Sequence, residues 1–135
     1  MNPAQILLVK KSWRRVREID PLLLAEVFYN RLFSMHPSLR KMFPENLEVQ
    51  YGRLLDTFNI IVMRLENLDS INQHISDLGA RHQDYGTKPE HYALMGQTLI
   101  HTLKECLGDE WNTPTEEAWN FCFETLASRM MIAKN

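Results

Sequence analysis

The sequence predicts an all-α protein, and three observations lead to that prediction. Apolar residues recur at spacings of three and four along most of the chain, which is the period of a helix face. Proline follows a capping-type residue at Asn2, Asp20 and Thr113, a pattern typical of helix starts. No stretch alternates apolar and polar residues as a half-buried strand does. We therefore expect about six main helices and at least one short one, in a single domain spanning residues 1–135.

Composition excludes several classes of function. The chain has 135 residues, of which 44% are hydrophobic and 24% charged, as in ordinary globular domains. A net charge of −2 gives no electrostatic basis for binding nucleic acid or an anionic membrane. Cys106 and Cys122 match no metal, redox or haem-attachment spacing, so we expect reduced thiols in a cytoplasmic protein. No apolar run approaches a membrane span, and the N-terminus lacks a signal-peptide pattern.

The first two helices are predicted from their starts and their apolar faces. Asn2 and Pro3 begin one, whose face carries Ile6, Val9, Trp13 and Val16. Asp20 and Pro21 begin the next, which should end near Met35. Its apolar stripe is Leu23, Leu24, Val27, Phe28, Leu32 and Phe33. A stripe this broad indicates a helix packed on more than one side.

A short segment and a third long helix should follow. Pro37 and Pro44 bound a segment of barely two turns, because proline ends helices and restricts the residue before it. A helix is then predicted from Leu47 to Leu65. Its core candidates are Tyr51, Leu54, Leu55, Phe58, Ile61, Val62 and Leu65. Gly52 lies inside this helix, where glycine lowers helix stability by about 1 kcal/mol relative to alanine. Such a glycine often permits close approach of a neighbouring backbone or a ligand.

The next helix is predicted to begin at Ser70 and to carry Ile71, Ile75, Leu78 and His82 on its apolar face. Gly86 and Pro89 then break the chain. Thr87 and Glu90 form a capping-box pattern at the start of another helix, which should close at Gly108. Its stripe is Tyr92, Met95, Leu99, Leu103 and Cys106.

The last helix should open at Thr113 and Pro114, with Glu116 in its first turn. Its face comprises Ala118, Cys122, Leu126 and Met130, with Trp119 and Phe123 alongside. The pattern gives no sign of a repeat, a linker or a second domain.

Few side chains stand out as candidates for chemistry. A single histidine on an apolar helix face, such as His82, is more often a core residue with satisfied hydrogen bonds than a metal ligand. Tyr29 by itself indicates a core tyrosine, Phe43 a loop anchor, and Gln50 an exposed residue that shares a face with Arg53. The sequence holds no HExxH, GxSxG, P-loop or GxGxxG motif. We assign no catalytic residue, and any chemistry would come from a bound cofactor.

Two segments carry a resemblance to a known family. FYNRLFSMHPSLRKMF (28–43) and LGARHQDYGTKPEHYALMGQTLIHTLKECLGDEW (78–111) resemble the globin family, in particular single-domain bacterial haemoglobins and the globin domain of flavohaemoglobins. The similarity extends over essentially the whole chain. It implies the globin fold, a three-over-three helical sandwich that encloses one haem b.

The resemblance also implies roles for particular residues. His82 matches the proximal iron ligand, whereas Tyr29 and Gln50 match distal hydrogen-bond donors to a bound gas. Two such donors in a dry cavity predict slow O2 release. Each hydrogen bond to bound O2 contributes about 1–3 kcal/mol, and about 1.4 kcal/mol corresponds to a tenfold change in affinity. The residues expected to contact haem are Phe28, Phe43, Arg53, Leu54 and Tyr92.

The expected function is reversible binding of O2, with NO and CO as further ligands. The alternative is a haem enzyme, an NO dioxygenase or a protein that reacts with nitrite or peroxide, supplied by an external reductase. In flavohaemoglobins a glutamate of the last helix pairs with the tyrosine matched by Tyr92; here that position falls near Lys134, and no acid follows Glu124. Flavin and nicotinamide domains are not found before Asn135. A third class is a cofactor-free helical module for interaction or sensing.

Overall fold

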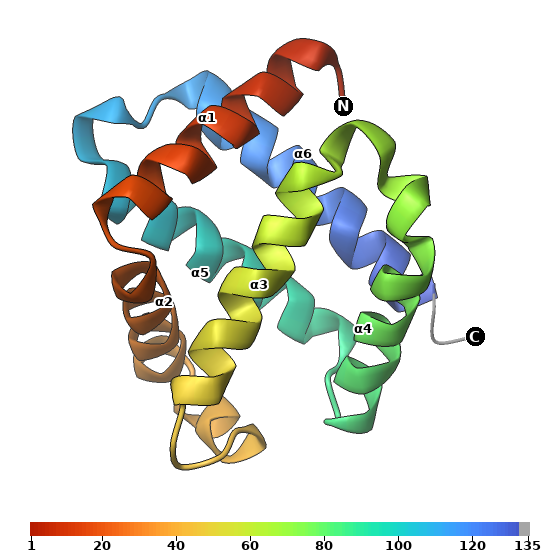
Figure 1. Ribbon diagram of the computed structural model, residues 1–135. Helices are drawn as coiled ribbons and strands as arrows, with labels where there is room; N and C mark the ends of the chain where they lie inside the picture. Colours follow the sequence, from red (N-terminus) through yellow and green to blue (C-terminus); the bar gives the residue numbers. More distant parts are fainter. Residues whose placement is uncertain (133–135) are drawn as a thin grey trace.

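The computed structural model describes residues 1–132, and within this part of the chain helices joined by short loops occur, with no strand (Figure 1). The all-α prediction is confirmed. The α-helices are α1 (Pro3–Ile19), α2 (Pro21–Met35), α3 (Glu48–Met63), α4 (Asn72–Asp84), α5 (Pro89–Leu107) and α6 (Thr113–Ile132). Three 3₁₀ helices connect them, namely η1 (Pro37–Met42), η2 (Leu65–Ile71) and η3 (Gly108–Glu110).

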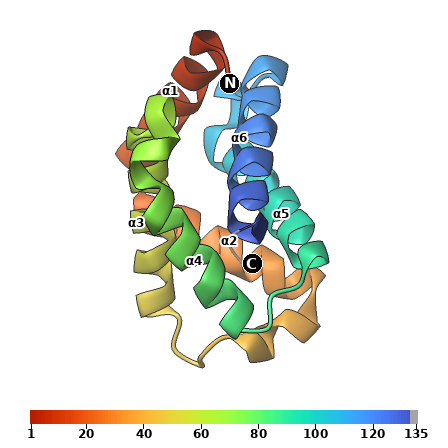
Figure 2. The same ribbon diagram turned by 90° about the vertical axis from the view of Figure 1, so that its right-hand side faces the viewer.

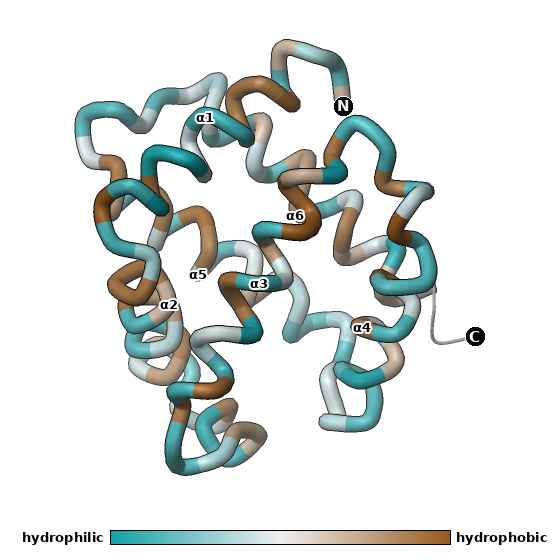
Figure 3. Tube along the Cα trace, viewed as in Figure 1, coloured by the Kyte–Doolittle hydropathy of each residue, from teal (hydrophilic) through white to brown (hydrophobic). Residues whose placement is uncertain are grey.

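The helices form two layers. Figure 2 shows α1, α3 and α4 on one side of the molecule and α5 and α6 on the other. Packing between layers joins segments far apart in sequence, because α1 packs on α6, α2 on α5, and α4 on α6. Apolar residues recur along each helix in Figure 3, as expected when every helix buries one face. No helix among residues 1–132 is long and apolar enough to cross a membrane.

Two of the predicted helix starts form as expected. The Asn2 side chain accepts a hydrogen bond from the Gln5 backbone at 2.8 Å, and the Gln5 side chain accepts one from the Asn2 backbone at 3.1 Å. The Asp20 carboxylate accepts from the backbone N–H of Leu22 at 3.1 Å. These bonds satisfy donors that no preceding turn can reach, so the boundaries could be predicted from local sequence.

Three predicted boundaries are wrong in detail. Ser70 does not cap α4; its hydroxyl donates to the Asn67 carbonyl at 2.7 Å inside η2. The third long helix stops at Met63, where the chain tightens into η2. At the start of α5 the Lys88 backbone donates to His91 Nδ1 at 3.0 Å, in place of a Thr87–Glu90 pair. The errors at Ser70 and Thr87 arise because neighbouring polar residues compete for the same backbone groups.

One half of the core is built around three aromatic rings. Trp13 lies 5.7 Å from Phe58 and 6.1 Å from Trp119 between ring centroids, joining α1, α3 and α6. Both indole N–H groups are satisfied, because Trp13 donates to Asn59 and Trp119 donates to Ser12 at 2.9 and 2.7 Å. Buried tryptophan needs such a partner to avoid the cost of an unpaired donor. The predicted faces are confirmed as core for Val9, Trp13 and Val16 of α1 and for Phe58, Ile61 and Val62 of α3.

Not every residue of the predicted stripes is buried. Leu23 is 43% exposed at the start of α2, and Cys106 is only half-buried in α5. Both lie at an edge of their helix face, where a periodic pattern cannot show how far the neighbouring helix extends.

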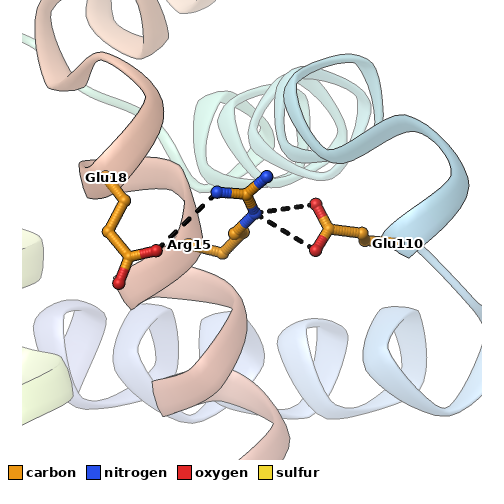
Figure 4. Close-up of polar contacts among 3 residues, drawn as sticks. All are labelled: Arg15, Glu18 and Glu110. Atoms are coloured by element: carbon orange, nitrogen blue, oxygen red, sulfur yellow. Dashed lines mark hydrogen bonds and ion pairs between the residues drawn. The ribbon is translucent and has the colours of Figure 1, made fainter.

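The surface also carries links between distant segments. Arg15 of α1 donates to both carboxylate oxygens of Glu110 in η3, at 3.1 and 2.9 Å, and lies 3.7 Å from Glu18 (Figure 4). These carboxylates raise the pKa of the Arg15 guanidinium. Because all three side chains are exposed, solvent screens the pair, and we expect it to contribute little to stability.

The backbone of α4 packs closely on α6 and η2. A Cβ added to Gly79 would collide with the main-chain oxygen of Met130, so glycine permits α4 to approach α6 closely. Arg129 of α6 donates to Asp69 and Asn72 at 3.0 and 2.9 Å beside this contact. No Cα of α4 comes within 8 Å of a Cα of α3 or α5, helices that are described over their full length.

Candidate functional site

Tyr29 and Gln50 meet across the interface of α2 and α3. The Gln50 amide Nε2 donates to the Tyr29 hydroxyl at 3.1 Å. Tyr29 is 2% exposed, and Gln50 is half-buried, so the bond is shielded from bulk water. Since the hydroxyl oxygen accepts from Gln50, its own proton is left to donate elsewhere, and no acceptor for it lies in hydrogen-bond range within residues 1–132.

An aromatic cluster fixes the Tyr29 ring. Its centroid lies 5.0 Å from that of Phe28, 5.8 Å from Phe33, 5.6 Å from Phe43 and 5.7 Å from Tyr51. Edge-on and tilted ring pairs at these separations are favourable. The four neighbours come from α2, from the loop before α3 and from α3 itself. The hydroxyl is therefore held in place by three segments.

The protonation state of Tyr29 follows from this packing. Burial raises the pKa of its phenol to about 12, against the smaller opposing effect of the Gln50 hydrogen bond. The hydroxyl therefore stays protonated at neutral pH. It can act as a hydrogen-bond donor and not as an anion.

His82 lies in the last turn of α4 and is half-buried. Its Nδ1 lies 2.8 Å from the Leu78 carbonyl oxygen, one turn back, so Nδ1 carries the proton and donates. Burial lowers the pKa of the imidazole despite this hydrogen bond, which keeps the ring neutral at pH 7. A neutral imidazole protonated at Nδ1 has a free lone pair on Nε2, and this lone pair can bind a metal.

Tyr92 of α5 packs against His82. Their rings are stacked with centroids 6.2 Å apart, and the ring of the exposed Tyr85 lies edge-on to His82 with centroids 6.4 Å apart. The buried Tyr92 hydroxyl has no hydrogen-bond partner among the described residues. The Lys134 position, discussed above as the place of an acidic partner, lies outside them. An unpaired buried hydroxyl costs free energy, so it marks a place where another polar group fits.

The remaining site candidates are distributed unevenly. Phe28 and Phe43 join the cluster around Tyr29, and Leu54 is half-buried one turn after Gln50. Arg53 is exposed and makes no hydrogen bond or ion pair within residues 1–132. The structure brings together one group around Tyr29 and another around His82, and among the described residues no Cα of α4 lies within 8 Å of a Cα of α2 or α3.

Sequence reasoning missed one residue near this site. Arg40 of η1 donates to backbone carbonyls of the loop that carries Phe43. Its position between Pro37 and Pro44 could have indicated this role. A loop bounded by prolines has carbonyl groups that no helix satisfies, so a nearby donor side chain is expected to bind them.

The haem implied by the resemblance can be tested against these residues. His82 offers one neutral nitrogen, and residues 1–132 contain no group of three His, Cys, Asp or Glu side chains to complete a protein-only metal site. Iron in a porphyrin brings four nitrogen ligands with it, so a single imidazole is sufficient. The Tyr92 hydroxyl, buried beside His82 with no hydrogen-bond partner among residues 1–132, leaves a polar atom that a bound group would satisfy. The donor set therefore fits haem.

A family model described as Globin matches residues 26–130 of the chain. Among curated proteins, the chain is 29% identical over 130 residues to a protein named flavohemoprotein from Vibrio cholerae, covering 90% of this chain and 33% of that protein. It is 32% identical over 104 residues to a flavohemoprotein from Halalkalibacterium halodurans, covering 74% of this chain and 25% of that protein. The chain thus spans a third or less of these relatives.

Solved structures give the same fold. A bacterial globin from Campylobacter jejuni superposes with a TM-score of 0.87 at 21% identity, covering 98% of this chain and 96% of that chain. An engineered carbene transferase from Rhodothermus marinus, named also as a nitric oxide dioxygenase, reaches 0.89 at 21% identity and covers 99% and 93% of the two chains. At this identity the likeness concerns the fold alone.

Proposed function

The chain belongs to the globin family, and on that premise we propose that it binds haem b and uses the Tyr29–Gln50 pair to hold O2 reversibly. Haem supplies a ferrous iron that takes O2, NO or CO as a ligand. The protein supplies a neutral nitrogen on one side and hydrogen-bond donors on the other. The family membership and the donor set both support the proposal.

On the distal side, Tyr29 and Gln50 act as a pair. The Gln50 amide donates to the Tyr29 oxygen, which directs the phenol proton away from Gln50. A bound gas that carries partial negative charge would accept a hydrogen bond from this phenol O–H, in a place that the aromatic cluster shields from water. Hydrogen bonds are stronger in such surroundings than at the surface. Leu54, Phe28 and Phe43 contribute apolar surface that excludes water.

On the proximal side, His82 provides Nε2 while Nδ1 donates to the Leu78 carbonyl. That carbonyl fixes the tautomer and the ring orientation, as second partners of metal-bound histidines do. Tyr92 stacks on the ring and limits its rotation. Arg53, exposed beside Gln50, is proposed to meet a haem propionate.

The observation that carries the proposal is the 3.1 Å contact between Gln50 Nε2 and the Tyr29 hydroxyl. The test is O2 dissociation measured by stopped flow on the haem-loaded protein. Tyr29→Phe removes the phenol donor and leaves the ring, so release should become roughly tenfold to a hundredfold faster. Gln50→Leu should accelerate release by a smaller factor, because the phenol remains.

Two outcomes would refute this assignment. Purified protein that shows no Soret absorption after haem is supplied does not bind haem. Unchanged O2 release in Tyr29→Phe would show that the phenol makes no hydrogen bond to the ligand. Phe33→Leu is a control for cluster packing, because Phe33 touches Tyr29 and has no polar group.

A second candidate function is NO dioxygenation with an external reductase. The relatives named flavohemoprotein favour it, and this chain spans only a third or less of each. Rapid mixing of the O2-loaded protein with NO, with a reductase and its nicotinamide cofactor present, should then give sustained nitrate formation. A single turnover followed by arrest would favour reversible binding.

We also propose that the chain is one cytoplasmic domain. Cys106 and Cys122 are free, and burial raises the pKa of the Cys122 thiol to about 12, which makes it inert. One cooperative unfolding transition is expected for the chain as given. Recovery of the native protein in an extracytoplasmic fraction would contradict the location.

A further inference from the structure

The Arg40 side chain holds the loop between η1 and α3. Its Nη1 donates to the Phe43 carbonyl at 3.3 Å and to the Pro44 carbonyl at 2.9 Å, and its Nη2 donates to the Glu45 carbonyl at 2.8 Å. The guanidinium also lies over the Phe33 ring, with its Cζ 5.2 Å from the ring centroid. One planar group thus joins three successive carbonyls to an aromatic ring of α2.

Few other contacts fix this loop. Pro44, Glu45 and Asn46 are exposed, and η1 has no Cα within 8 Å of a Cα of α3. The N-cap residue of α3, Leu47, makes no side-chain cap bond, and the Asn46 side chain accepts only from the nearby Glu48 backbone. Within residues 1–132, Arg40 is the only side chain outside the loop that donates hydrogen bonds to it.

The two ends of this loop carry parts of the distal group. Phe43 packs against Tyr29 at 5.6 Å and against Phe33 at 5.3 Å. Gln50 lies in the first turn of α3 and donates to the Tyr29 hydroxyl. A change in the path of the loop would therefore move the ring on one side of Tyr29 and the amide on the other.

We propose that Arg40 is a positioning residue of the distal pocket: it fixes the path of residues 43–47, and so fixes how Gln50 and Phe43 meet Tyr29. Its effect on a bound gas rests on the proposed function; its effect on the loop does not. Arginine is required because the carbonyls are reached by two separate nitrogens of one rigid plane. A lysine keeps the charge but offers a single nitrogen, so it restores only part of the effect.

The first measurement does not depend on haem. NMR order parameters of the Glu45 and Asn46 amides are compared in wild type, Arg40→Gln, Arg40→Lys and Lys41→Gln, using the full chain. Lys41 is the matched control, because it is the next residue and is exposed. In Arg40→Gln the order parameters should fall from about 0.85 towards about 0.6, whereas Lys41→Gln should match wild type. Unchanged values in Arg40→Gln would overturn the proposal.

The second measurement links the loop to the pocket. With haem and CO bound, the C–O stretching frequency reports hydrogen bonding beside the ligand, and in Arg40→Gln it should shift in the direction that Gln50→Leu gives. O2 release should become roughly threefold to tenfold faster, with Arg40→Lys in between. In the Gln50→Leu background, Arg40→Gln should add much less, because residues that act through one another are not additive.

The outcomes separate the two hypotheses. Protein that fails to bind haem refutes the proposed function, yet the order parameters still test the Arg40 contact. A loosened loop with unchanged C–O frequency and O2 release would overturn the positioning role. Full additivity of Arg40→Gln and Gln50→Leu would do the same. If Arg40→Gln does not fold, Arg40→Lys carries both measurements.

Discussion

The two sides of the proposed haem site are built in different ways. Tyr29 is fixed by four aromatic neighbours and by Gln50, which come from α2, from the loop after η1 and from α3. His82 is fixed by its own helix, through the Leu78 carbonyl, and by one stacked ring from α5. Its helix α4 packs on α6 and η2, and makes no backbone contact with α3 or α5 in the described chain.

This difference suggests a division of tasks. On the distal side, Tyr29 is buried within an aromatic cluster, so the proposed hydrogen bond to a ligand would have a fixed geometry. The proximal side depends on one helix, whose closest approach to α6 is at Gly79. We therefore expect changes near Tyr29 to alter ligand release and changes near α4 to alter the retention of haem. Two substitutions and one change of pH test that expectation.

The largest effect is expected for His82→Ala. Removing the only proposed protein bond to iron should make haem transfer to an acceptor protein roughly a hundredfold faster, equivalent to about 2.7 kcal/mol. Added imidazole should reverse part of that loss, and circular dichroism should show an intact fold. His91→Ala is the matched control, since His91 Nδ1 accepts from the Lys88 backbone and loses only a helix-start bond worth about 1 kcal/mol. Equal haem loss in the two variants would contradict the assignment of His82.

A smaller effect is expected for Gly79→Ala. The added methyl meets the Met130 main chain, so α4 and α6 must separate, at a cost of about 1–3 kcal/mol in the free energy of unfolding. Urea unfolding and haem retention should both worsen, while the O2 release rate of the loaded fraction stays near wild type. Gly52→Ala provides the comparison, because nothing lies within 4 Å of the new Cβ, and it should stabilise α3 by about 0.5–1 kcal/mol. Similar stability changes in both would show that the Gly79 contact is unimportant.

The smallest effect is expected from pH. The folded pKa of Tyr29 is about 12, above the ordinary value of 10.0. Because the folded pKa is raised, the buried protonated phenol contributes to the stability of the fold. This contribution is complete below pH 10.0 and is lost as pH rises through about 12. O2 release should therefore be constant between about pH 7.5 and about pH 9.5. A marked change there, absent from Tyr29→Phe, would show that the phenol ionises and that the distal side is wetter than its packing indicates.

The sequence by itself determined the helices and their apolar faces. Period and caps are local properties, so the starts at Asn2 and Asp20 and the position of His82 on an apolar face follow from neighbours in the chain. The same locality explains the errors at Ser70 and at Thr87, where several polar residues compete for the same backbone groups. The resemblance to globins supplied the roles of the site residues, which spacing alone left open.

Only the tertiary structure decided which of these residues meet. The contact between Gln50 and Tyr29 spans 21 positions and depends on how α3 packs on α2. The Arg40 contacts depend on the path of a loop that has no periodic pattern. Whether the Tyr92 hydroxyl finds a partner among residues 1–132 depends on which side chains surround it. The apolar residues of a helix face recur with a period that can be seen in the sequence. Contacts between two helix faces depend on interhelical distances, which only the packing of the helices determines.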